Sequence, residues 1–219
     1  MAGLLDILTA GKKTGNPKYG LEGKTADQKT VIDYYTSPLP SAKDERKVDE
    51  ILSARVRQFN LFQMALARFG LDVDQVKEIP PVFCDGYYVD TDEDDAENLP
   101  LFRIGNDKVF RSSKYQMTVL LFSSEELYAY SVIFDLASKD FYEHLEEYFY
   151  RDIVSVKTIH DVDDVIVNSG CMGKTLHLEK KYHGFAIVSS GDVYTCALRE
   201  QQLGSLQGMI HLIRDKKSA

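Results

Sequence analysis

The sequence predicts an α+β fold in which a helical N-terminal segment precedes a strand-rich domain closed by a C-terminal helix. Three observations carry this prediction. Apolar residues recur at helical spacing before Pro80, they alternate with a period of two after Pro81, and they return to a helical stripe at the end of the chain. We expect an arm and helical segment over residues 1–80 and the strand domain over residues 81–219.

The N-terminal segment reads as a polar arm followed by helices. Residues 11–40 are rich in Gly, Lys, Thr and Pro without a sustained period, which predicts a loosely ordered arm. A helix should begin after Ser41, a candidate N-cap, and end at Gly70, which tolerates the left-handed conformation. A short second helix is expected from Asp72 to the Pro80-Pro81 pair. The first helix carries an apolar face that must pack on the strand domain or on a second copy. It consists of Val48, Leu52, Phe59, Phe62, Leu66 and Phe69.

After Pro81 the chain contains a series of short strand candidates. They are Val82–Val89, Lys108–Phe110, Tyr115–Phe122, Leu127–Phe134, Phe141–Tyr150, Ile153–Ile159, Thr175–Lys180, Phe185–Ser189 and Val193–Cys196. A final helix is expected from Leu198 to about Lys216. Its apolar stripe comprises Leu203, Leu206, Ile210 and Ile213, and we expect it to bury against an open face of the strands.

Two stretches resemble bacterial pleckstrin-homology-like proteins. They are Glu147–Lys157 and the strand–turn–strand–helix order around Ser189–Asp192. In addition, the segment Ala67–Pro80 looks like the helical leader of such proteins. The resemblance implies a seven-stranded barrel of two sheets, plugged at one end by the C-terminal helix. Relatives bind phosphoinositides through basic residues in the loop between the first two strands. Here that loop is Ser123–Glu126, which is acidic, so the lipid-binding role is not carried over.

Composition narrows the class of partner and the compartment. The 219 residues include 44% hydrophobic side chains and carry a net charge of −8, which disfavours binding to nucleic acid. Cys84, Cys171 and Cys196 are odd in number and lack CxxC spacing, which indicates reduced thiols and a cytoplasmic location. No apolar run is long enough for a transmembrane helix.

No motif predicts a metal, cofactor or phosphate site. The acidic run Asp90–Glu97 begins like a calcium-binding loop, but Asp95 replaces the glycine and Leu101 the bidentate glutamate, so we interpret it as a solvated loop. The GKT sequences ending at Thr25 and Thr175 resemble phosphate loops. The first lacks the earlier glycine and the second is followed by a strand pattern, so both are interpreted as turns.

The sequence also offers no catalytic residues. His144, His160, His177, His183 and His211 do not stand at ligand spacing, although His177 and His183 are expected to flank one turn. Cys171 and Cys196 have no basic neighbour, and Ser190 is not in a nucleophile elbow. A further group, the strand tyrosines, is interpreted as packing residues; it comprises Tyr128, Tyr130, Tyr142, Tyr148 and Tyr150.

The leading functional hypothesis is therefore a non-catalytic interaction or scaffold module that binds a protein partner or itself. A second hypothesis is weak recruitment to anionic membrane by the N-terminal arm. Its basic residues are Lys12, Lys13, Lys18 and Lys24, and its apolar residues are Leu4, Leu5, Ile7 and Leu8. A third is an enzyme whose site is assembled from residues distant in sequence. No small-molecule ligand is indicated.

Overall fold

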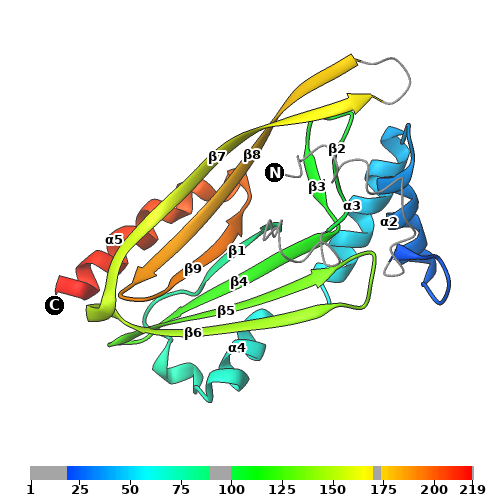
Figure 1. Ribbon diagram of the computed structural model, residues 1–219. Helices are drawn as coiled ribbons and strands as arrows, with labels where there is room; N and C mark the ends of the chain where they lie inside the picture. The colour runs from blue at the N-terminus through cyan, green and yellow to red at the C-terminus, as the bar shows by residue number, and fades with distance from the viewer. Residues whose placement is uncertain (1–18, 89–99, 170–173, 219) are drawn as a thin grey trace.

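A four-stranded antiparallel sheet lies between a layer of helices and a three-stranded antiparallel sheet (Figure 1). The computed structural model describes residues 19–88, 100–169 and 174–218. The four-stranded sheet has the order β1-β4-β5-β6, the three-stranded sheet has the order β7-β8-β9, and β2 and β3 form a separate hairpin. The strands are β1 (Val82–Tyr87), β2 (Phe102–Ile104), β3 (Phe110–Ser112), β4 (Lys114–Phe122), β5 (Glu126–Asp135), β6 (Phe141–Phe149), β7 (Ile153–Ser169), β8 (Lys174–Ser189) and β9 (Val193–Leu198).

The helical layer contains α2 (Ala26–Thr36), α3 (Ala42–Val56) and α4 (Leu61–Phe69). The prediction of an arm without regular structure is wrong for α2, whose N-terminus is fixed by a capping box between Thr25 and Gln28. The single helix expected after Ser41 is two helices, because the side chain of Asn60 caps a new helix start by accepting from the backbone N–H of Gln63. The predicted stop at Gly70 is confirmed, with φ of 67°. Only the 3-10 turn η2 (Val73–Gln75) forms where a second helix was expected.

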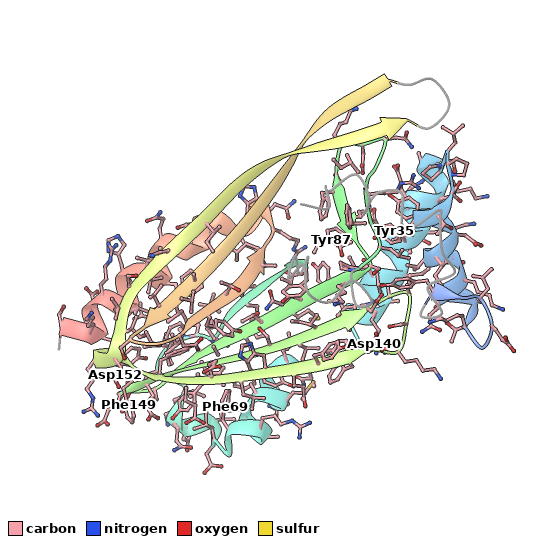
Figure 2. All side chains as sticks on the ribbon, in the orientation of Figure 1. Tyr35, Phe69, Tyr87, Asp140, Phe149 and Asp152 are labelled. Carbon is pink, nitrogen blue, oxygen red and sulfur yellow. The ribbon has the colours of Figure 1, made fainter. Side chains whose placement is uncertain are left out.

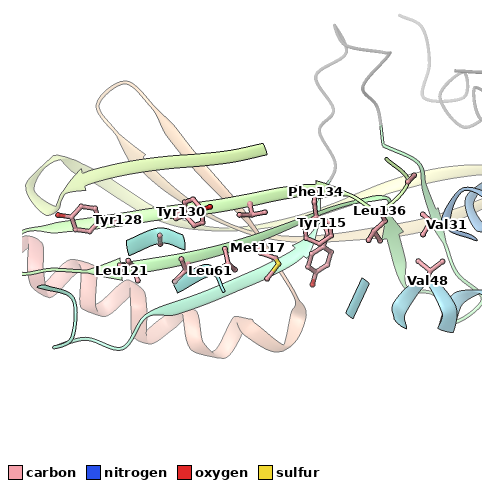
Figure 3. Close-up of a cluster of buried hydrophobic side chains, with 14 of the residues drawn as sticks. Val31, Val48, Leu61, Tyr115, Met117, Leu121, Tyr128, Tyr130, Phe134 and Leu136 are labelled. Carbon is pink, nitrogen blue, oxygen red and sulfur yellow. The ribbon is translucent and has the colours of Figure 1, made fainter. Parts of the chain in front are cut away.

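One core lies between the helices and the four-stranded sheet, and Figure 3 shows part of it. Side chains of β4 and β5 alternate between the two faces of the sheet, as strand geometry requires. Tyr115, Met117 and Val119 on β4 face the helices and are buried. Phe59 stacks on Phe134 of β5, with ring centroids 5.3 Å apart. The apolar face of the helices was expected to pack either on the strand domain or on a second copy. In the structure it packs on the strands of the same chain.

A second core fills the other face of the same sheet. Leu120 and Phe122 of β4 point into it and meet Phe185 and Ile187 of β8. Because β4 is covered on both faces, all nine of its residues are buried. This double burial explains why β4 reads as a nearly continuous run of large side chains.

The C-terminal helix α5 (Leu203–Ser218) closes the second core. Met209, Ile210 and Ile213 are buried there, and the Lys217 ammonium donates to the backbone oxygen of Ile153 at 2.7 Å. The helix starts later than expected, after the 3-10 turn η4 (Glu200–Gln202). The side chains of Leu203 and Leu206, also expected in the stripe, lie outside the part of the chain whose side chains are described.

The seven-stranded pleckstrin-homology-like barrel is contradicted by the structure. The described strands form three antiparallel sheets of four, two and three strands, and these do not close into a barrel. The 3-10 turn η3 (Tyr150–Asp152) and a register shift at the start of β7 carry the chain from the first sheet into the second, so β6 and β7 do not pair. The predicted strands over Thr175–Lys180 and Phe185–Ser189 are one strand, β8, which pairs with β7 beyond the end of β9.

Candidate functional site

Several residues singled out in the sequence lie outside the described residues. These are the acidic run Asp90–Glu97, Cys171, and the basic residues Lys12, Lys13 and Lys18 of the N-terminal arm. The first GKT sequence is described, and it precedes α2. There the hydroxyl of Thr25 accepts from the backbone N–H of Gln28 at 3.2 Å, so this hydroxyl serves as a helix cap.

The structure does not place His177 and His183 on opposite sides of a turn. His177 and His183 both lie on β8, where their register partners on β7 are Ile166 and His160, so the expected turn between them does not exist. His144 on β6 contacts Glu146 at 2.9 Å, and His211 is exposed on α5. Within the described residues no three His, Cys, Asp or Glu side chains gather as metal ligands do.

Cys84 of β1 and Cys196 of β9 meet inside the second core. Both are buried and not joined by a disulfide. Hydrogen bonding between the two thiols, together with burial, raises the pKa of Cys196 well above its ordinary value. A thiol in this state is a poor nucleophile. The pair is therefore a packing contact between the two sheets.

A cluster of charged side chains joins α3 to the β2–β3 hairpin. The guanidinium of Arg111 is buried and donates to both carboxylate oxygens of Asp49, at 2.9 and 2.8 Å, and of Asp107, at 2.9 and 2.8 Å. The Arg111 guanidinium also holds the pKa of Asp107 below its ordinary value of 3.8. Each guanidinium nitrogen thus has a carboxylate partner within the chain. This arrangement fixes the hairpin to the helix and leaves Arg111 with little capacity for an external anion.

Tyrosines surround this cluster, and Figure 2 shows Tyr35 and Tyr87 between the helical layer and the sheet. Tyr87 donates to Asp49 at 3.4 Å. The hydroxyls of Tyr34 and Tyr35 are buried and find no hydrogen-bond partner among the described residues. Burial raises the pKa of Tyr34 to about 12. These phenols are neutral near pH 7, and they act as packing groups of the first core.

The strand tyrosines behave largely as the sequence suggests. Tyr128, Tyr130, Tyr148 and Tyr150 are buried, whereas Tyr142 is 49% exposed. Tyr142 lies on β6, which leaves all but one of its nine side chains exposed or half-buried.

The outward side of β6 forms the most open surface of the four-stranded sheet. Within the described chain, β6 pairs only with β5, and Figure 1 shows it along the outer margin of that sheet. Figure 2 locates this margin between the labelled Asp140 and Phe149. Four large side chains on its nine residues are exposed: Phe141 by 38%, Tyr142 by 49%, Leu145 by 38% and Phe149 by 41%. We call residues Phe141–Phe149, with their outward backbone groups, the β6 edge.

The hydrogen bonds at both ends of β6 show which backbone groups point outward. Asp135 N–H donates to the carbonyl of Asp140, and Tyr150 N–H donates to the carbonyl of Glu125, each at 3.1 Å. The even-numbered residues therefore direct their backbone groups toward β5. Because successive residues of an antiparallel strand alternate in this respect, the odd-numbered residues direct N–H and C=O away from the sheet. They are Phe141, Glu143, Leu145, Glu147 and Phe149.

Two other outer strands carry local protection that β6 lacks. On β1, the Gln202 side chain accepts from Asp85 N–H at 3.2 Å and donates to the carbonyl of Phe83 at 3.5 Å, so two of the outward groups have partners. On β7, a register shift and the bond from Lys217 to Ile153 disturb the start of the strand. Bulges and capping groups of this kind prevent pairing with another chain. The β6 edge has a regular register and lacks lysine and proline.

The acidic residues of β6 are partly neutralised. Arg68 of α4 donates to both carboxylate oxygens of Glu143, at 3.0 and 2.7 Å, and Tyr130 donates to the same carboxylate. The Arg68 guanidinium and then the Tyr130 hydroxyl hold the pKa of Glu143 below its ordinary value. Glu146 contacts His144. Glu147 is exposed and forms no ion pair within the described residues. The β6 edge is therefore acidic, and Glu143, on the side toward α4, is paired with an arginine.

Comparison with known proteins identifies no relative: no family model, curated protein or solved structure matches the chain. The resemblance of Glu147–Lys157 to pleckstrin-homology-like proteins therefore stays a prediction as to family. No described helix is long and apolar enough to span a bilayer.

Proposed function

We propose that this chain is a non-catalytic protein-interaction module that binds an extended segment of a protein partner along the β6 edge. The observation that carries the proposal is the coincidence of two features on one strand. Odd-numbered residues present backbone groups that have no partner in the described part of the chain, and four large apolar side chains, Phe141, Tyr142, Leu145 and Phe149, are exposed beside them. Sheet edges of this kind accept a further strand.

A docked strand would obtain affinity and specificity from different groups. Main-chain hydrogen bonds to the outward N–H and C=O groups supply sequence-independent affinity. The side chains above and below the edge supply specificity. Phe141 stacks on Phe59 of the helical layer at 5.7 Å, so the odd-numbered face continues the first core. His144 lies 5.3 Å from the ring of Tyr194, so the even-numbered face borders the second sheet. A partner strand with apolar residues on both faces fits this edge.

The charged groups of the described chain support binding over catalysis. The guanidinium of Arg111 donates its hydrogen bonds to Asp49 and Asp107, and the buried thiols of Cys84 and Cys196 contact each other. The net charge of −8 disfavours nucleic acid as the partner. We place the module in the cytoplasm as part of the same proposal, because two neighbouring cysteines that remain free fit a reducing compartment.

Selection from a library of random peptides tests the proposal. The library is selected on the full chain at low protein concentration, and the enriched peptides are measured by fluorescence anisotropy. Leu145→Pro is the informative variant, because its lost N–H points outward and is not part of the β5–β6 ladder. Phe83→Ser is the matched control: it removes a side chain that is 50% exposed on β1, where the Phe83 carbonyl already accepts from Gln202.

We expect peptides with alternating apolar residues, saturable binding, and a loss of affinity of about tenfold or more in Leu145→Pro but not in Phe83→Ser. Enrichment of no peptide, or equal binding by both variants, would contradict a docking site on β6. Circular dichroism on each variant separates a lost site from a lost fold.

A further inference from the structure

The sequence of β6 is nearly its own mirror image. Read from either end it gives Phe-Tyr-Glu, one variable residue and Leu, because Phe141, Tyr142 and Glu143 are matched by Phe149, Tyr148 and Glu147 around Leu145. The single departure is His144 opposite Glu146. A strand with this symmetry presents the same order of side chains to an antiparallel copy of itself.

We infer that the partner of the β6 edge is a second copy of this chain, paired antiparallel to the first about a two-fold axis through Leu145. The inference rests on the proposed function, since it assigns the occupant of that edge. In closed symmetric dimers, each residue of a shared patch contacts its counterpart across the axis. The register centred on Leu145 pairs each residue of β6 with its mirror position, so the whole strand is used.

The backbone geometry permits this register. The outward groups belong to odd-numbered residues, so directly opposed residues that exchange hydrogen bonds must both be odd. Centring on Leu145 opposes Leu145 to itself, Glu143 to Glu147, and Phe141 to Phe149. All five odd-numbered residues then exchange bonds with the second copy. The β5–β6 ladder, which uses the even-numbered residues, is left intact.

The side chains favour the same register. The pairs it creates are Phe141 with Phe149 and Tyr142 with Tyr148, and aromatic cross-strand pairs stabilise sheets. His144 meets Glu146 of the second copy twice, a complementary donor–acceptor pair. A shift by two residues would oppose Phe141 to Glu147 instead and leave both Phe149 side chains without their aromatic counterparts.

Two symmetry-related pairs oppose like charges, and the structure shows what offsets them. Glu143 faces Glu147 of the second copy, which by itself is destabilising. Arg68 lies 2.7 Å from Glu143 and its side chain is 55% exposed. Each such pair therefore includes two carboxylates and one guanidinium. The opposed glutamates also disfavour stacking of further copies in other registers, which is consistent with a closed pair.

Cysteine cross-linking tests the axis directly. In the full chain carrying Cys171→Ser, Leu145→Cys places two thiols on the axis, with Cα atoms about 5.5 Å apart for a hydrogen-bonded pair, within the range a disulfide spans. Glu143→Cys is the matched control, since its two copies would lie about 14 Å apart along the strands, too far to bridge. Cys84 and Cys196 stay in place because they are buried.

We expect light scattering to show a concentration-dependent dimer, and mild oxidation to convert Leu145→Cys, but not Glu143→Cys, to a covalent dimer. A second pair of variants guards against misfolding. Leu145→Lys and Leu145→Glu should each be monomeric alone, and mixing them should restore dimers, because residue 145 meets its own counterpart. A monomer at every concentration, equal cross-linking of both cysteines, or no recovery on mixing would overturn the inference. If the protein is monomeric but still binds selected peptides at β6, the proposed function stands and only the dimer inference fails. If the monomer binds no peptide, the proposed function and the dimer inference both fail.

Discussion

Replacing Arg111 by methionine is the sharpest test of how the helical layer is attached to the strands. Arg111 lies on β3 and its side chain is 4% exposed. It reaches Asp49 on α3 and Asp107 in the hairpin loop, each through two hydrogen bonds. Methionine has a similar length and suits the apolar surroundings, so the substitution removes the charged contacts with little change in volume.

The structure sets the size of the expected effect. Breaking a fully buried ion pair costs about 3–5 kcal/mol, because a charge is left without a partner in a dry site. Here the residual charges are the carboxylates of Asp49 and Asp107, whose side chains are 44% and 42% exposed. Water can solvate them once the guanidinium is gone. We therefore expect a loss of about 2 kcal/mol in the free energy of unfolding, below the fully buried range.

Equilibrium urea denaturation, followed by circular dichroism, measures this loss. Arg68→Met is the matched control, because Arg68 makes the same two-bond contact with Glu143 but is 55% exposed, and it should change the midpoint far less. An Arg111→Met protein with the midpoint of the wild type, or one no less stable than Arg68→Met, would refute the view that this cluster fixes the hairpin to α3.

Three further predictions concern stability. Because the pKa of Asp107 is depressed in the folded state, its contribution is present above the ordinary value of 3.8 and is lost as the pH falls below it. Acid should therefore lower the urea midpoint less in Arg111→Met than in the wild type. Gly86→Ala should cost about 1–3 kcal/mol by thermal denaturation, because the added Cβ would lie 3.0 Å from a side-chain atom of β9; an unchanged melting temperature would contradict that close approach. Ile213→Ala should cost about 2–5 kcal/mol, since Ile213 is 1% exposed in the second core, and a loss under about 1 kcal/mol would mean that α5 is not docked there.

Local signals in the sequence predicted much of the secondary structure. The period-two pattern located β4, β5 and β6 to within one or two residues, because these strands carry large side chains along their whole length. Ser41 and Gly70 marked real helix boundaries. The break before α4 was missed although Asn60 is a good N-cap, since the apolar period continues across it.

The incorrect predictions concern the pairing of strands, which no local sequence pattern encodes. The predicted strand ended at Ile159, whereas β7 continues to Ser169 because β8 pairs with it residue by residue. The expected barrel of two sheets came from a family resemblance, whereas the described strands form sheets of four, two and three strands that do not close. The β6 edge was not predicted either, because the identity of an edge strand follows only from the strand order. The mirror symmetry around Leu145 was the one sequence signal available for it.

Residue-resolved amide hydrogen exchange along β6 tests the central claim most directly. The amides of Tyr142 and His144 bond to β5 and should be protected under all conditions. The amides of Glu143, Leu145 and Glu147 point outward, so they should exchange rapidly in dilute protein. They should become protected in concentrated protein or with a selected peptide. The claim that β6 is the docking edge is contradicted if these three amides exchange at the same rate in dilute protein, in concentrated protein and with the peptide.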